Sequence, residues 1–149
     1  MPIARAKDVA VLIDADAQLA VDLDADGVHI AADRRVYDRA RETVGAGRIV
    51  GVDCGTARHD AMECAEAGAD YVMMDETFRM PQGDTLISWW ASVMQVPVVA
   101  SHSSDARTIG QLAATGADFV RPQDSMWQTP EQAAAIVSAA NRAIAEALA

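Results

Sequence analysis

A short phrase that occurs three times constrains what this chain can fold into more than any other feature. Its copies are Asp24-Ala-Asp-Gly-Val-His-Ile30, Gly68-Ala-Asp-Tyr-Val-Met-Met74 and Gly116-Ala-Asp-Phe-Val-Arg-Pro122. Each copy follows an alanine-rich amphipathic stretch. We therefore expect the first residue of the phrase to end a helix, the Asp to turn the chain, and the apolar residues to begin a buried strand.

Three further apolar runs, at 9–13, 48–52 and 96–100, alternate with the copies of the phrase. Together they predict six strands, which begin near residues 9, 27, 48, 71, 96 and 119. The spacing of 18 to 25 residues between strand starts is typical of parallel strands joined by short helices. The sequence therefore predicts an α/β fold, a (β/α) array of about six units with a parallel sheet, in a single domain over residues 1–149.

Capping residues support helices between the predicted strands. We expect Asp33 to start a helix that runs to Val44, and Thr129 with Pro130 to open the last helix. Similar signals predict three more helices, over 57–67, from Asp84 through Met94, and over 105–115, with Thr56, Asp84 and Ser104 as caps.

Charge and composition exclude several classes of partner. The formal charge is -10, from 22 acidic and 12 basic residues, whereas nucleic acids and anionic membranes bind basic surfaces. Lys7 is the single lysine, which excludes Schiff-base chemistry at a strand end. The two cysteines lack a metal-binding spacing, and the sequence has neither an 18-residue apolar run nor the apolar core of a signal peptide. We therefore expect a soluble cytoplasmic protein.

Polar and charged residues gather where the predicted strands end, and parallel α/β folds bind ligands at that edge. Glu76 or Asp75 is a candidate general base, and His102 or His29 is a candidate general acid. The candidates for substrate binding are Asp14, Asp53, Ser101, Ser103 and Arg121. Two alternatives remain open, since a strand-end Asp can be a plain helix cap and the Arg can form a salt bridge to a nearby acid. No spacing defines a metal site, although oxygen and imidazole ligands could come from Asp14, His29, Asp53, Asp75 and His102.

The order and spacing of these phrases resemble the thiamine phosphate synthase/TenI superfamily. The best markers are Asp26-Gly-Val-His-Ile30, Ile49-Val-Gly-Val52, Ala65-Glu-Ala-Gly-Ala-Asp-Tyr-Val72 and Pro97-Val-Val-Ala100. The resemblance implies a TIM barrel that binds thiazole phosphate. In the synthases of the family, a pyrimidine diphosphate and Mg²⁺ bind as well, and the TenI branch includes thiazole tautomerases. At 149 residues the chain is shorter than a complete barrel of about 200 to 250. Aligned in this way, it is an incomplete TIM-barrel-like array that lacks the first two βα units.

Several positions depart from the family pattern. Ala15 stands where a magnesium-binding Asp is expected, and Arg34 stands where the second such Asp would fall. His102 and Ser103 replace the paired glycines that grip phosphate. We therefore expect a protein that has lost the parent transferase reaction and acts as a ligand-binding or interaction module. The alternative is a divergent enzyme of thiamine or thiazole phosphate metabolism, a transferase or a thiazole tautomerase, that uses the strand-end Asp, Glu and His residues.

An array of six strands leaves two unpaired sheet edges, and such edges are usually covered or paired. We therefore expect a homodimer, with the first and last strands or the Trp89-Trp90 pair near the contact. Adjacent helix positions point about 100 degrees apart, so one of these two tryptophans belongs in the core. The other is a candidate contact residue.

Overall fold

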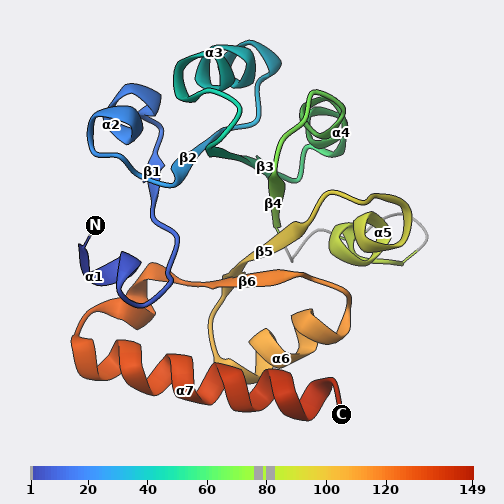
Figure 1. The fold of residues 1–149 in the computed structure, drawn as a ribbon. Coiled ribbons are helices and arrows are strands. Elements are labelled where there is room, and N and C mark those ends of the chain that lie inside the picture. Colours follow the sequence, from blue (N-terminus) through green and yellow to red (C-terminus); the bar gives the residue numbers. More distant parts are fainter. Residues whose placement is uncertain (1, 76–78, 80–82) are drawn as a thin grey trace. The chain divides into compact units, whose positions relative to one another are not determined.

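The computed structural model describes residues 2–75, 79 and 83–149, apart from the side chain of His102 (Figure 1). By its internal contacts, the chain divides into two compact units, unit 1 (Met1–Val72) and unit 2 (Met73–Ala149). The single domain over residues 1–149 stays a prediction.

The described residues form six strands, and a helix follows each one. The strands are β1 (Leu12–Asp14), β2 (Gly27–Ala31), β3 (Ile49–Gly55), β4 (Tyr71–Asp75), β5 (Val98–Ser103) and β6 (Phe119–Pro122). The helices are α1 (Pro2–Arg5), α2 (Ala17–Asp22), α3 (Arg34–Val44), α4 (Arg58–Glu66), α5 (Leu86–Val93), α6 (Ala106–Ala114), the 3-10 helix η1 (Asp124–Trp127) and α7 (Pro130–Ala147). The strand order in the sheet is the chain order, with parallel pairing of β1 to β2, β2 to β3 and β5 to β6. The predicted α/β array of six parallel strands is confirmed.

The Asp of the repeated phrase does more than turn the chain. In all three copies, its backbone N–H donates to the carbonyl oxygen of a valine at the start of the preceding strand, and its carboxylate accepts a hydrogen bond from the N–H of that same valine. The pairs are Asp26 with Val11, Asp70 with Val50, and Asp118 with Val98, and the carboxylate bonds are 2.7, 2.8 and 2.8 Å long. The phrase therefore joins each new strand to the one before it, which sets their register.

The first residue of the phrase ends a helix, as predicted. Gly68 and Gly116 have φ angles of 100° and 99°, in the region that favours glycine. Asp24 has a φ of 50°, and Asp tolerates this left-handed conformation better than most residues.

Two of the predicted helix caps are confirmed and three are wrong. Asp33 caps α3, and Thr129 forms a capping box with Gln132 at the start of α7. In α5 and α6 the cap is one residue later than predicted, at Thr85 instead of Asp84 and at Asp105 instead of Ser104. Thr56 was predicted to cap α4, but the residue before α4 is Ala57, which forms no side-chain cap. Neighbouring residues of the same capping type are equivalent in the sequence, and only the backbone path decides between them.

The core of unit 1 lies between the strands and the helices that follow them. Val28, Ile30, Val50 and Val52 are buried on one face of β2 and β3. Helices α2, α3 and α4 lie on one side of β1, β2 and β3 (Figure 1). In unit 2, Trp90 is fully buried, and its Nε1–H donates to the Val96 carbonyl oxygen at 2.8 Å. Trp89 is half-buried, so one tryptophan of the pair belongs to the core, as expected.

Within the part of the chain that the structure describes, no helix is both long enough and apolar enough to cross a membrane.

Candidate active site

Unit 1 presents a second strand face, opposite the buried valines. Side chains alternate between the two faces of a strand, so the residues between the buried valines point the other way. Asp14 lies beside His29 in the register of β1 and β2, and His29 lies beside Gly51 in the register of β2 and β3. Asp53 lies two residues beyond Gly51, at the carboxyl end of β3. We call Asp14, His29, Gly51, Asp53 and Tyr71 the site face.

His29 and Tyr71 form a hydrogen-bonded pair on the site face. The Tyr71 hydroxyl lies 2.8 Å from Nδ1 of His29. The two rings are nearly parallel, with an angle of 6° between their planes and 5.7 Å between their centres. A Cβ added to Gly51 would lie 1.9 Å from Cζ of Tyr71. Glycine at this position therefore makes the room that lets the tyrosine ring reach His29.

Tyr71 and Gly51 are site residues that the sequence analysis missed. A usable signal existed, because both residues occur in the phrases quoted for the family resemblance. A glycine inside a strand often marks the close approach of another group. The pattern could not show which group approaches, since His29 and Tyr71 are 42 residues apart in the chain.

The two predicted acids of unit 1 lie at strand ends and are exposed. Asp14 ends β1, while Asp53 accepts a hydrogen bond at Oδ1 from the Gly55 N–H at 3.1 Å. Neither caps a helix, because Asp16 caps α2 and Ala57 precedes α4. Two solvated carboxylates on this edge are suited to attract a positively charged group.

In unit 2, the two predicted serines hydrogen bond to the backbone of neighbouring strands. Ser101 donates from Oγ to the Met74 carbonyl oxygen at 3.1 Å, and Ser103 donates to that of Arg121 at 3.2 Å. Both serines are buried. These bonds join β5 to β4 and to β6, so each serine has a structural role at this end of the sheet.

Arg121 is exposed and forms an ion pair of 3.0 Å with Asp124, which is the salt-bridge alternative left open by the sequence. Asp75 ends β4 and is half-buried. Glu76 lies outside the described residues, as does the side chain of His102, whose backbone belongs to β5. The roles of Asp75, Glu76, His29 and His102 as base and acid therefore stay predictions.

The family's magnesium ligands do not fit the residues at the corresponding positions. Ala15 has no ligand atom in its side chain, and Arg34 pairs with Asp38 at 2.8 Å. The nearby acids serve as helix caps: Asp16 accepts from the Leu19 N–H, and the backbone N–H groups of Val36 and Arg35 lower the pKa of Asp33. Among residues 2–75, 79 and 83–149, no group of three or more His, Cys, Asp or Glu side chains could hold a metal ion.

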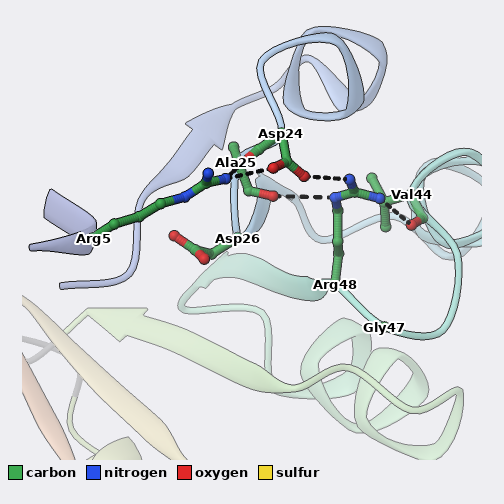
Figure 2. Close-up of a pocket in the computed structure, with 7 residues that line it drawn as sticks. All are labelled: Arg5, Asp24, Ala25, Asp26, Val44, Gly47 and Arg48. Atoms are coloured by element: carbon green, nitrogen blue, oxygen red, sulfur yellow. Dashed lines mark hydrogen bonds and ion pairs between the residues drawn. The ribbon is translucent and has the colours of Figure 1, made fainter. Parts of the chain in front are cut away.

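The opposite end of the strands carries a charged cluster that the sequence analysis did not predict. Asp24 accepts hydrogen bonds from Arg5 at 2.5 Å and from Arg48 at 3.1 Å, beside a surface pocket (Figure 2). The bond and charge of Arg5, followed by the bond of Arg48, lower the pKa of Asp24. Arg48 also donates to the Ala25 carbonyl oxygen. Both guanidinium groups already pair with a carboxylate, so the cluster is suited to hold chain segments together.

Comparison with known proteins gives relatives over most of the chain. The family model described as "Thiamine monophosphate synthase" matches residues 1–121. A protein of Rhodospirillum centenum named thiamine-phosphate synthase is 36% identical over 148 residues, covering 95% of this chain and 72% of the relative. One of Erythrobacter litoralis with the same name is 37% identical over 141 residues, covering 89% of this chain and 66% of the relative. The chain thus spans about two thirds to three quarters of the length of these relatives.

Solved structures agree on the fold. Thiamine phosphate pyrophosphorylase from Pyrococcus furiosus matches with a TM-score of 0.81 at 20% identity, over 99% of this chain and 73% of that one. A structure titled "Native KDPGal structure" matches with a TM-score of 0.74 at 18% identity, over 99% of this chain and 75% of that one. At these identities, the likeness supports the α/β architecture alone.

The relatives overturn one prediction. We expected a protein that had lost the transferase reaction, without thiamine phosphate synthase activity, but relatives at 36% and 37% identity over most of the chain are named thiamine-phosphate synthase. The expectation was wrong because it weighed single substitutions, such as Ala15 and Arg34, above the similarity of the whole chain. The match over 121 residues and the identities of these relatives establish that the chain belongs to the thiamine monophosphate synthase/TenI family.

Proposed function

We propose that this chain acts as a thiamine-phosphate synthase, which joins a thiazole phosphate to a pyrimidine diphosphate. The observation that carries the proposal is the identity of 36% and 37% to relatives of that name over 95% and 89% of the chain. In the reaction, a bond forms between the thiazole nitrogen and the methylene carbon of the pyrimidine. The bond from that carbon to the diphosphate oxygen breaks, and pyrophosphate leaves with the electron pair.

The charge change of this reaction suits the acids of the site face. A neutral thiazole nitrogen becomes a positively charged thiazolium when the new bond forms. Asp14 and Asp53 are exposed carboxylates at the carboxyl ends of β1 and β3, where parallel α/β folds bind ligands. A negative charge held near the developing positive charge lowers the energy of the transition state. We assign this role to Asp14 and Asp53.

Within unit 2, Arg121 is kept as the predicted phosphate-binding residue. It lies at the end of β6, and a guanidinium group binds phosphate oxygens in a forked geometry. Its ion pair with Asp124 is exposed, and exposed pairs of this kind are worth about 0 to 1 kcal/mol. A bound phosphate could therefore displace Asp124 at low cost. No step is assigned to Mg²⁺, because the residues at the family's ligand positions do not fit it.

The test is an assay of the purified chain with both substrates, with product measured by chromatography. The Rhodospirillum centenum relative, assayed beside it, verifies the substrates. We expect product in proportion to the amount of chain, and about a tenfold loss of activity in Asp53→Asn, equivalent to about 1.4 kcal/mol. Glu42→Gln is the matched control, because it removes one exposed negative charge on α3, outside the site face. Product at the level of the reaction without protein, while the relative is active, would refute the proposed function.

The same purified chain tests the predicted homodimer. Light scattering at micromolar concentration should give twice the 15.8 kDa mass of the chain. The mass of one chain would contradict the homodimer and would leave the proposed activity unaffected.

A further inference from the structure

Three neighbouring strands each contribute one residue of unit 1 to a single arrangement. β2 contributes His29, β3 contributes Gly51 and β4 contributes Tyr71. The ring of Tyr71 occupies the space that a side chain on Gly51 would need, and its hydroxyl reaches Nδ1 of His29 at 2.8 Å. Gly51 itself is buried and lies in register with His29. The pairing of β2 with β3 therefore places Gly51, and the tyrosine ring that lies over it, beside His29.

The chemistry of the pair favours one direction of hydrogen bonding. The Tyr71 hydroxyl lies 2.8 Å from Nδ1 of His29, a distance at which one of the two atoms donates a hydrogen bond to the other. A phenol has an ordinary pKa of about 10 and is a good donor, while an unprotonated imidazole nitrogen is a good acceptor. When Tyr71 donates to Nδ1, the neutral ring carries its hydrogen on Nε2.

We propose that Tyr71 is a positioning residue that holds His29 in the Nε2–H tautomer, in which Nε2 is a hydrogen-bond donor. The use of this donor in a reaction rests on the proposed function. Tyr71 acts through His29 and is not itself assigned a contact with substrate. Gly51 is part of the same arrangement, because any larger side chain would displace the tyrosine ring.

The first experiment measures the tautomer directly and does not depend on activity. Nitrogen-15 NMR at about pH 8, where an ordinary histidine is neutral, distinguishes the two tautomers for the three histidines of the chain. His29→Gln assigns the signals, because it removes those of one ring. We expect His29 to be an Nε2–H tautomer in the wild type, with a larger share of Nδ1–H in Tyr71→Phe.

The matched control is Tyr37→Phe, which removes the hydroxyl of the other tyrosine of the chain. Tyr37 is buried in unit 1, whereas Tyr71 is half-buried, and the Tyr37 hydroxyl donates to the Ala67 carbonyl oxygen at 3.2 Å. We expect Tyr37→Phe to leave the His29 signals unchanged. An Nδ1–H tautomer in the wild type would overturn the proposal even if Tyr71→Phe failed to fold, and so would a His29 spectrum that Tyr71→Phe does not change.

The second experiment measures the consequence for the reaction. Tyr71→Phe should lower kcat about tenfold, the order expected for one misplaced hydrogen bond, with little change in KM. His29→Gln, whose amide can place an N–H near the position of Nε2, should keep more activity than His29→Asn, whose amide lies near Nδ1. Adding Tyr71→Phe to His29→Gln should cause no further loss, since the glutamine has no tautomer to hold.

The outcomes separate this inference from the proposed function. If the chain has no synthase activity but His29 is still held as the Nε2–H tautomer, the proposed function is refuted, and so is the use of His29 as a donor in that reaction. The positioning of His29 by Tyr71 would still stand. An active chain in which Tyr71→Phe and His29→Gln have fully additive effects would refute the positioning role alone.

Discussion

The two ends of the strands use the same residue type in opposite ways. At the amino ends, the Asp residues of the repeated phrase bond to the backbone of the preceding strand, as Asp26 does to Val11 and Asp70 does to Val50. At the carboxyl ends, Asp14 and Asp53 are exposed, and within the described residues neither forms a salt bridge. The difference teaches that the surroundings of an Asp depend on the strand end that it occupies. The acids of the amino ends are bonded to backbone, and the acids of the carboxyl ends keep an exposed carboxylate, to which we assign the proposed chemistry.

The charges of unit 1 follow the same division. Arg5 and Arg48 pair with Asp24, and Arg41 pairs with Asp70 at 2.5 Å, all near the amino ends of the strands. These pairs compensate the acids there. The acids of the carboxyl ends keep their negative charge exposed, which is the condition for attracting a charged ligand. Four substitutions or titrations test this contrast, from the largest expected change in stability to the smallest.

Replacing an acid of the amino ends should have the largest effect. Asp70→Ala removes the acceptor of the Val50 N–H and the partner of Arg41, and should lower the free energy of unfolding by about 2 to 3 kcal/mol. Asp70→Asn should cost less, because its amide oxygen still accepts from Val50. Urea unfolding followed by circular dichroism measures both. A loss below about 0.5 kcal/mol in Asp70→Ala would contradict the structural role of the phrase.

Replacing Gly51, in the middle of β3, should have the next largest effect on the free energy of unfolding. Gly51→Ala places a Cβ within 1.9 Å of the Tyr71 ring and should lower the free energy of unfolding by about 1 to 2 kcal/mol. Gly47→Ala is the control, since a Cβ there meets no atom within 4 Å. Equal unfolding midpoints for the two variants in a thermal melt would show that Tyr71 does not pack over Gly51.

The charged cluster of Asp24, Arg5 and Arg48 at the amino ends should make the stability of the fold depend on pH in the acidic range. The pKa of Asp24 in the folded chain is lowered from about 3.8 by Arg5 and Arg48, so its stabilising effect is fully present above pH 3.8 and is lost as the pH falls through the folded value. The stability difference between the wild type and Asp24→Asn should therefore be constant near neutral pH and disappear in stronger acid. Thermal melts from pH 7 to pH 2.5 measure it, and a difference that grows in acid would contradict the sign.

Replacing an acid of the carboxyl ends should have the smallest effect on stability. Asp14→Asn and Asp53→Asn remove exposed charges and should change the free energy of unfolding by less than about 0.5 kcal/mol. The same variants should lose synthase activity, which separates chemistry from folding. A loss of stability as large as that of Asp70→Ala would mean that the two strand ends do not differ in role.

The sequence by itself determined the elements and their order. The repeated phrase and the apolar runs predicted six strands, and five of the six begin within two residues of the predicted position, with β1 starting at Leu12 instead of near residue 9. These features depend on local backbone preferences and on the periodicity of apolar residues, which act over a few positions of the chain. Asp33 as the cap of α3 is of the same kind, because the cap and its partners are two and three residues apart.

Only the tertiary structure decided which polar residues meet. Strand register brings Asp14, His29 and Gly51 into one row, and Tyr71 reaches His29 across the glycine from 42 residues away. It also gave Asp26, Asp70 and Asp118 partners 15 to 20 residues away. Contacts of this length depend on the pairing of strands, which places every side chain on one face or the other. A list of strand-end residues could therefore name His29, but not the tyrosine that holds it.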